Sequence, residues 1–290
     1  MSARLFIIST PIGNLKDISA RAKEALASAN VVLAEDTRVS LKLLNHLDLK
    51  KKLISCHKFN EKSRLELLAT LFEENQDAAL ISDAGTPCLC DPGQLVIQTA
   101  IELGFEIVPI PGPTAIIQAL IGSGLDSSRF SFEGFLPDKK KDIKLLAQSL
   151  VHEKRTMVFF VPPHGLLEKL FTLAEIFKDR PACVARELTK MHEEFIRASL
   201  PEIHHFLNRE ENQAKLKGEF TLVIEGNKES EPEEEIDHEQ LRQYIQMALA
   251  NEQSVKDIAA SCQARFGMRK SEAYKLTLEI MQDSLGENNL

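Results

Sequence analysis

The chain has 290 residues, of which 43% are hydrophobic, which is sufficient for two domains with cores of their own. Its formal net charge of -8 excludes a protein that is basic over its whole surface, although a local basic patch is compatible with it. The five cysteines are odd in number and lack the spacing of a zinc or redox pair, so we expect free thiols and no metal. We find neither a signal peptide nor eighteen consecutive apolar residues, and we expect a soluble, cytoplasmic protein without membrane contacts.

The first 120 residues alternate predicted strands with predicted helices. Short apolar runs predict strands at residues 5–9, 31–34, near 53, 77–82 and 105–110. Helices are predicted at residues 19–29, 40–47, 61–74, 94–103 and from Thr114 onward. Pro92 suits the first turn of the helix at 94–103. The alternation predicts a mostly parallel sheet with helices on both faces, in an N-terminal domain of residues 1–120.

Residues 121–228 predict a second α/β domain with a less regular order of elements. Strands are expected at residues 130–135, 156–161, 182–186, 194–199 and 219–225, and helices at 138–150 and 163–177. This irregular order favours a mixed sheet. The predicted fold class is therefore α/β with two domains.

The last part of the chain differs in composition. Residues 229–238 form an acidic run, which we predict to be a linker. Residues 239–290 predict a small helical module, whose helices at 254–264 and 271–281 flank Gly267 in the outline of a helix-turn-helix. Five basic residues between 254 and 276 outnumber two acidic ones, 5 minus 2 giving +3: Lys256, Arg265, Arg269, Lys270 and Lys275. An ordinary helical hairpin with a solvated basic face is the alternative.

Three loops rich in proline and glycine each follow an apolar strand, and the longest of them ends at Gly93. They are residues 9–14, 83–93 and 109–114. Ligands of open α/β sheets bind outside the carboxyl ends of the strands, where such loops lie. The pattern therefore predicts a ligand site, whereas any one of these loops by itself is also explained as a tight connection.

Several common sites are missing from the sequence. It has no P-loop, no complete dinucleotide-binding fingerprint, no nucleophile elbow and no His-Glu-x-x-His pair. The residues by themselves thus predict an α/β enzyme that binds a ligand at the ends of its strands and has a basic C-terminal tail.

Seven motifs in order carry a resemblance to one family. They are Thr10-Pro-Ile-Gly-Asn-Leu15, Ala34-Glu-Asp-Thr-Arg38, Ser82-Asp-Ala-Gly-Thr-Pro87, Asp91-Pro-Gly93, Pro111-Gly-Pro-Thr-Ala115, Phe132-Glu-Gly-Phe-Leu-Pro137 and Ala185-Arg-Glu-Leu-Thr-Lys190. Over nearly the whole chain, they resemble the ribosomal RNA small subunit methyltransferase I family of the tetrapyrrole methylase superfamily. The resemblance implies a two-domain tetrapyrrole-methylase-like fold and a homodimer. It implies 2′-O-methylation of a cytidine ribose in the decoding centre of 16S rRNA, in the 30S subunit.

The resemblance also implies S-adenosyl-L-methionine (SAM) as cofactor, bound between the two domains. Its pocket would be lined from the first domain by Pro11, Asp83, Gly85, Thr86, Thr114 and Ala115, and from the second by Phe160 and Leu222. The basic tail would dock RNA through Arg265, Arg269, Lys270 and Lys275.

Four residues are candidates for the chemistry: Asp36 and Arg38 on the wall that carries these loops, and Glu187 and Lys190 on the opposite wall. Arg38 would hold phosphate, and a carboxylate or a neutral Lys190 would accept the proton of the acceptor hydroxyl. The alternatives are a helix cap with a surface ion pair for residues 35–38, and a solvated turn for residues 187–190.

One segment departs from the family. Where the family shows Tyr-Glu-Ser-Pro-His-Arg, this chain has Phe160-Val-Pro-Pro-His-Gly165, without the glutamate and the arginine. Two other functions therefore stay open at this stage. One is a precorrin-type methylase, whose first loop differs from Thr10-Pro-Ile-Gly13, and the other is a non-catalytic RNA-binding relative.

Overall fold

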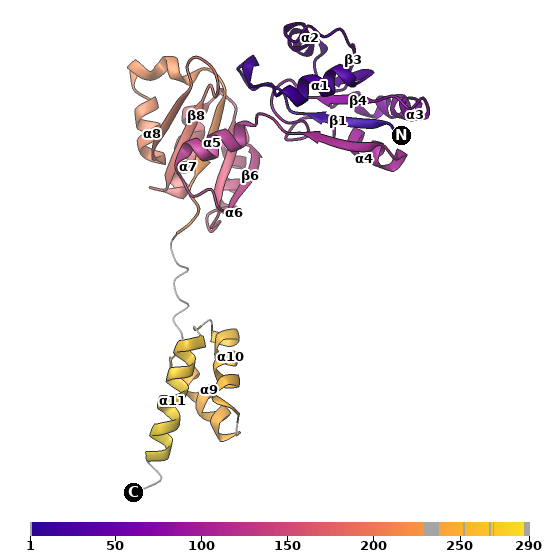
Figure 1. The fold of residues 1–290 in the computed structure, drawn as a ribbon. Helices are drawn as coiled ribbons and strands as arrows, with labels where there is room; N and C mark the ends of the chain where they lie inside the picture. Colours follow the sequence, from indigo (N-terminus) through magenta and orange to yellow (C-terminus); the bar gives the residue numbers. More distant parts are fainter. Residues whose placement is uncertain (1, 229–237, 252, 267, 269, 287–290) are drawn as a thin grey trace. The chain divides into compact units, whose positions relative to one another are not determined.

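The computed structural model describes residues 2–228, 238–251, 253–266, 268 and 270–286. By contacts the chain divides into two compact units, Met1–Asn227 and Lys228–Leu290. The first contains two sheets, and the described part of the second is helical (Figure 1).

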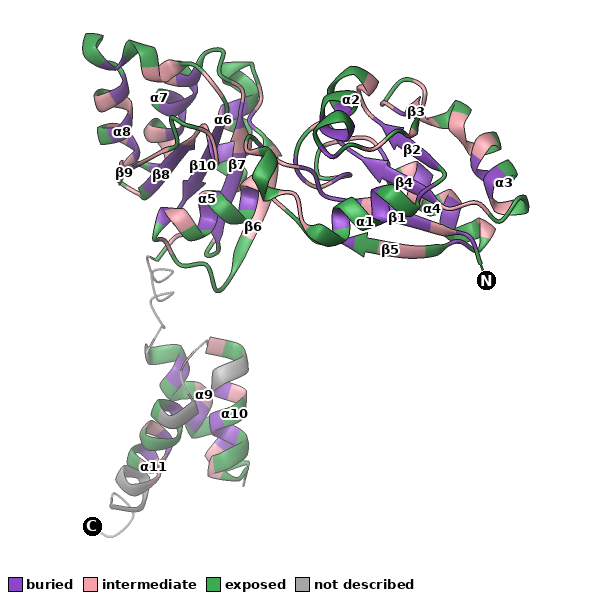
Figure 2. Ribbon diagram, turned by 45° about the horizontal axis from the view of Figure 1, so that its top comes forward, coloured by how far each residue is buried: buried purple, intermediate pink, exposed green. Residues whose placement is uncertain are grey.

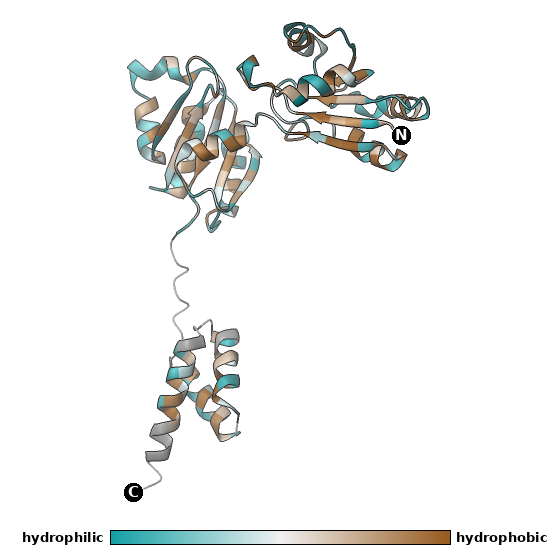
Figure 3. Cartoon of the chain, viewed as in Figure 1, coloured by the Kyte–Doolittle hydropathy of each residue, from teal (hydrophilic) through white to brown (hydrophobic). Residues whose placement is uncertain are grey.

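The first sheet has five parallel strands in the order β3-β2-β4-β1-β5. These are β1 (Arg4–Ile8), β2 (Val31–Ala34), β3 (Lys52–Ser55), β4 (Ala78–Ile81) and β5 (Glu106–Ile110). Alternate side chains of β1 enter opposite cores, since Phe6 packs with α1 (Ala20–Ser28) and α2 (Thr37–His46), and Leu5 packs with α3 (Leu65–Glu73) and α4 (Gln94–Leu103). The predicted parallel sheet with helices on both faces is confirmed. Its inner strands β1, β2 and β4 are mostly buried and hydrophobic, whereas the edge strands β3 and β5 are mostly half-buried or exposed (Figures 2 and 3).

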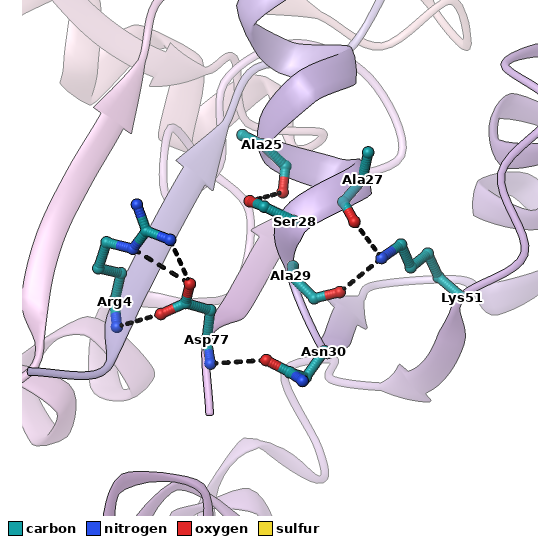
Figure 4. Close-up of polar contacts among 8 residues, drawn as sticks. All are labelled: Arg4, Ala25, Ala27, Ser28, Ala29, Asn30, Lys51 and Asp77. Carbon is teal, nitrogen blue, oxygen red and sulfur yellow. Dashed lines mark hydrogen bonds and ion pairs between the residues drawn. The ribbon is translucent and has the colours of Figure 1, made fainter. Parts of the chain in front are cut away.

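Polar contacts fasten the amino ends of these strands (Figure 4). The Asp77 carboxylate accepts hydrogen bonds from the backbone N–H (2.8 Å) and the Nε (3.1 Å) of Arg4, and Asn30 accepts one from the Asp77 N–H (2.9 Å). Lys51 donates to the carbonyls of Ala27 and Ala29. The amino edge of the sheet is thus closed by its own side chains, and the carboxyl edge carries the loops.

The second sheet is mixed, with the order β6-β7-β10-β8-β9. Only β6 and β7 pair in parallel. Its strands are β6 (Phe130–Phe135), β7 (Thr156–Val161), β8 (Pro181–Arg186), β9 (Glu194–Ser199) and β10 (Phe220–Ile224). One face packs against α6 (Lys140–Ser149), α7 (Leu166–Phe177) and α8 (Leu200–Leu207). The predicted mixed sheet is confirmed.

The other face of the second sheet is covered by α5 (Ala115–Ser123). Its buried side chains Ile116, Ala119 and Leu120 pack against β7, β8 and β10. The predicted boundary at residue 120 assigns α5 to the first domain. Because α5 packs on the second sheet, we propose that the two α/β domains divide at residues 111–114.

Several element ends differ from the prediction. Helix α2 begins at Thr37 because the Asp36 side chain caps it, and α7 begins at Leu166, after Gly165 with φ +71°. Pro92 lies outside α4, which is capped at Gly93 and whose first N–H groups are held by the carboxylate of Glu61. The predicted helix 61–74 is a 3-10 turn (Glu61–Arg64) followed by α3. Helix α8 and two further 3-10 segments, Leu15–Asp17 and Glu210–Leu216, were not predicted.

Three helices lie in the described residues of the second unit: α9 (His238–Ala250), α10 (Val255–Phe266) and α11 (Lys270–Gly286). Leu241, Ile258 and Cys262 belong to their shared core. The two predicted helices are present, α9 was not predicted, and the predicted linker lies outside the described residues except at residue 238. No helix within the described part of the chain is long and apolar enough to cross a membrane.

Candidate active site

The three loops that follow β1, β4 and β5 are joined by hydrogen bonds at the carboxyl edge of the first sheet. Thr10 and Gly85 pair through their backbones in both directions, at 2.8 and 3.0 Å. The hydroxyls of Ser9 and Thr86 share a hydrogen bond of 2.9 Å. Gly112, in the loop after β5, packs closely against Ser9, in the loop after β1: an added Cβ on Gly112 would lie 2.9 Å from the Cβ of Ser9. Each loop therefore holds the others in place.

These loops and the second sheet enclose a cavity of about 420 Å³. The first sheet and its loops contribute Ile12, Glu35, residues 83–86, Leu89, Asp91 and Thr114, and the start of α5 contributes Ala115 and Ile116. The second sheet and its loops contribute Phe135, residues 160–163 and residues 219–221. The volume lies within the range of small-molecule sites, roughly 300–1,000 Å³.

Most of the predicted cofactor residues line this cavity, namely Asp83, Gly85, Thr86, Thr114, Ala115 and Phe160. Leu222 does not, because it points into the core on the opposite face of β10 and is fully buried. Its neighbour Thr221, which pairs with Phe160 across the strands, lines the cavity instead. In the first loop Ile12 takes the place predicted for Pro11.

Three carboxylates, Glu35, Asp83 and Asp91, form what we call the acid wall of the cavity. Burial raises the pKa of each above its ordinary value. The effect is largest for Asp91, where burial, followed by the charges of Glu35 and Asp83, raises the pKa to about 6. Among the described residues, no three His, Cys, Asp or Glu side chains are arranged to hold a metal ion. The acid wall is therefore suited to a ligand that carries positive charge.

The raised pKa of Asp91 predicts a pH-dependent cost to stability. In the unfolded chain an aspartate has a pKa of about 3.9, so between about pH 4 and 6 the folded protein binds more protons. The contribution of Asp91 to the free energy of unfolding is therefore present at low pH and lost as the pH rises to about 6. We expect Asp91→Asn to stabilise the protein by about 1 kcal/mol at about pH 7.5, allowing for solvent screening, and not at pH 4.

Denaturant unfolding of both proteins at the two pH values measures this effect. Asp142→Asn, which changes an exposed aspartate on α6, should give no such difference. An equal increase in the free energy of unfolding for Asp91→Asn at both pH values would contradict the prediction.

Asp36 and Arg38 lie outside the cavity lining, although their neighbour Glu35 contributes to it. The Asp36 carboxylate caps α2 by accepting the backbone N–H of Arg38 (2.8 Å), and it forms an ion pair with the exposed Arg38 guanidinium. These hydrogen bonds lower the pKa of Asp36 to about 2. The geometry matches the helix cap with a surface ion pair that the sequence left open as the alternative.

Glu187 and Lys190 lie in a turn at one edge of the cavity. Lys190 Nζ donates to Glu187 Oε1 (3.0 Å) and to Glu219 Oε2 (3.1 Å), and Glu219 lines the cavity. Burial lowers the pKa of Lys190, but the hydrogen bonds and charges of the two glutamates outweigh it and raise the pKa above its ordinary value. The hydrogen bonds to the two glutamates favour the charged form of Lys190, which argues against its predicted role as a neutral base and leaves that role a prediction.

The same turn touches the first loop directly. A Cβ on Gly13 would lie 2.6 Å from Cγ of Lys190 and 2.9 Å from Oγ1 of Thr189. Within the turn, Glu187 and Thr189 have φ +50° and +64°, conformations that residues other than glycine rarely adopt. Such backbone strain is typical of ligand sites.

Comparison with known proteins decides the family. The model for tetrapyrrole (corrin/porphyrin) methylases matches residues 4–204. A Pseudomonas aeruginosa protein named ribosomal RNA small subunit methyltransferase I is 40% identical over 95% of this chain and 96% of its own. A Synechocystis protein of the same name is 40% identical over 96% and 99%, and one from Halalkalibacterium halodurans is 37% identical over 94% and 93%. The chain belongs to the ribosomal RNA small subunit methyltransferase I family.

Solved structures with the same fold include uroporphyrin-III-C-methyltransferase from Thermus thermophilus, with a TM-score of 0.53 and 18% identity over 77% of this chain and 94% of that one. Diphthine synthase has a TM-score of 0.57 and 15% identity over 77% and 90%. These likenesses concern the fold, which is that of the tetrapyrrole methylases.

The segment of residues 160–165 forms part of the cavity wall. Val161, Pro162 and Pro163 line the cavity. The ammonium of the buried Lys169 fixes the segment by donating to the carbonyl of His164 (2.6 Å) and to Asp138 Oδ1 (3.1 Å). The segment thus presents apolar side chains to the cavity, and Lys169 holds its backbone in place.

The sequence predicts no role for several residues of the cavity, among them Leu89, Asp91, Phe135 and Glu219. Asp91 and Phe135 lie in motifs that carry the family resemblance, so their position in the sequence was visible. The strand bulge and the loop contacts that turn these side chains toward the cavity could not be seen in the sequence.

Proposed function

We propose that this protein transfers a methyl group from SAM to the ribose 2′-oxygen of a decoding-centre cytidine of 16S rRNA in the 30S subunit. The proposal is supported by the names of relatives that are 37–40% identical over nearly the whole chain. The observation that carries it is the cavity between the three joined loops and the second sheet. We further propose that the chain acts in the cytoplasm as a homodimer.

The precorrin-type alternative has less support. Solved tetrapyrrole methyltransferases such as uroporphyrin-III-C-methyltransferase, which is 18% identical, are similar to this chain in fold alone. A small tetrapyrrole gives no role to a separate helical unit, whereas RNA does.

The residues of the cavity fit SAM as cofactor. When bound, SAM supplies a methyl group on a positively charged sulfur, and the acid wall provides the opposite charge. Ile12, Ala115 and Phe160 give apolar surface for the rest of the molecule. The proline- and glycine-rich loops offer backbone carbonyls for C–H···O contacts.

The chain's own residues then have three tasks. The joined loops fix the wall that orients the reactants, since methyl transfer needs the acceptor oxygen in line with the methyl carbon. The apolar segment at residues 161–163 excludes water. A carboxylate of the acid wall accepts the proton of the ribose hydroxyl, and Asp91, with a pKa of about 6, is the best matched to neutral pH.

The proposed function predicts a product that resists alkali at one position. A 2′-O-methyl group removes the hydroxyl that attacks the neighbouring phosphate, so one cytidine should be missing from the alkaline ladder of 16S rRNA. The measurement uses 30S subunits that lack the modification, incubated with the enzyme and SAM, and a reaction without SAM is the control. A methylated base with an intact ladder would exclude the ribose as the acceptor.

A further inference from the structure

Phe135 is a large aromatic side chain that is exposed at the cavity. It lies at the carboxyl end of β6, lines the cavity, and is 55% exposed. The register of β6 against β7 shifts between Phe132 and Phe135, and Gly134 has φ +75°. Such a bulge re-aims the side chain that follows it. The backbone therefore presents this ring to the cavity.

The Phe135 ring is braced by other aromatic rings. Its centroid is 5.2 Å from that of Phe160, which lies 4.9 Å from Phe132 in an edge-on contact. The outer face of such a ring is a fixed apolar platform.

A second exposed apolar side chain faces the same cavity from the first domain. Leu89, in the loop after β4, is 40% exposed and lines the cavity. The next residue, Cys90, has its sulfur 3.9 Å from the position of a Cβ on Gly134, so this loop runs beside the bulge. Leu89 and Phe135 together outline an apolar slot.

The position of the slot at the edge of the second sheet indicates which ligand it binds. β6 is the edge strand of its sheet, whereas Phe220 and Thr221 lie on the central strand β10 and Phe160 on β7. A small cofactor fits the inner part of the cavity, and a base that is part of a long RNA must enter from the edge. Unpaired bases that are turned out of an RNA stack on aromatic side chains.

We infer that Phe135 and Leu89 form a stacking slot for the base of the nucleotide that is turned out of the RNA for methylation. This inference rests on the proposed function and adds the place where the target base binds. The adenine of SAM is the competing occupant, and the experiment separates the two.

The chain contains no tryptophan, so Phe135→Trp introduces a single fluorescent reporter into the slot. We expect a short single-stranded RNA with the decoding-centre sequence to quench its emission, in the presence of saturating SAM, and SAM alone to leave the emission unchanged. Phe130→Trp, at the other end of the same strand and outside the cavity lining, is the matched control and should respond to neither. Quenching by SAM alone, or equal RNA quenching in both variants, would overturn the inference.

Kinetics with unmodified 30S subunits give a second measurement. Phe135→Ala should raise KM for the subunits by about 5- to 100-fold, the effect of losing one base–aromatic stack, and leave calorimetric SAM affinity unchanged. Phe135→Tyr should restore KM, and Phe130→Ala should not change it. An unchanged KM in Phe135→Ala refutes the slot alone, whereas a wild-type enzyme that never methylates the subunits refutes the proposed function.

Discussion

Gly85→Val is expected to lose about 10- to 100-fold in affinity for SAM while the protein remains folded. Gly85 has φ +77° and lines the cavity, and both of its backbone polar groups pair with Thr10. A β-branched residue at this φ costs on the order of 1–3 kcal/mol, and each 1.4 kcal/mol is a tenfold change. A Cβ by itself would have ordinary contacts, 3.4 Å from Ile12 and 3.9 Å from the carbonyl oxygen of Pro113, so the strained φ is the first obstacle.

Two further variants separate strain in the loop from general damage. Gly124 ends α5 with φ +76° and has no atom within 4 Å of an added Cβ, so Gly124→Val carries the same strain outside the cavity. It should cost stability and leave SAM affinity unchanged. Gly85→Asn should lose less than Gly85→Val, because asparagine tolerates positive φ. Calorimetric titration with SAM measures all three, and unchanged affinity in a folded Gly85→Val protein would contradict the cofactor assignment.

Removal of residues 228–290 is expected to lower kcat/KM for 30S subunits by about 100-fold while SAM affinity stays the same. The first unit is compact without these residues, and the helical unit has a core of its own. Linking a second binding module can raise avidity roughly 10²–10⁴-fold, so its removal costs affinity for the large substrate only. Methylation at the full rate by the shortened chain would exclude a docking role.

Charge reversal tests the same unit without shortening the chain. Lys256 and Lys275 are exposed on α10 and α11, and Arg265 lies 5.1 Å above the ring of Tyr244. Of the other predicted RNA contacts, Arg269 and the side chain of Lys270 lie outside the described residues. Lys256→Glu with Lys275→Glu should flatten the salt dependence of RNA binding. Glu279→Lys adds positive charge to α11 and serves as the opposite control: it should steepen the salt dependence of RNA binding.

Much of the fold could be predicted because strand and helix patterns are local. The parallel sheet follows from the alternation of apolar runs with helices, and the strand 156–161 agrees residue for residue with β7. Helix α8 was missed although its capping box is visible in the sequence, with the Glu202 carboxylate accepting the backbone N–H of Ser199. It is only eight residues long and begins beside Pro201, which weakens the helical pattern.

The site could be predicted only as far as its loops. That residues 9–14, 83–93 and 111–114 meet follows from parallel strands, whose carboxyl ends share one edge. Which residues of β10 line the cavity could not be predicted, because one residue along a strand reverses the face: the sequence predicts Leu222, whereas Thr221 lines the cavity. The charge of Lys190 depends on Glu219, which is distant in sequence.

The anchored segment at residues 161–165 has a thermodynamic consequence. Two consecutive prolines fix their own backbone torsions, and the buried ammonium of Lys169 holds the next residue. Ordering a flexible loop costs roughly 1–2 kcal/mol per residue in lost backbone entropy, and this wall has lost most of that freedom before any ligand arrives. We therefore expect this wall to bind a ligand with little further entropic penalty.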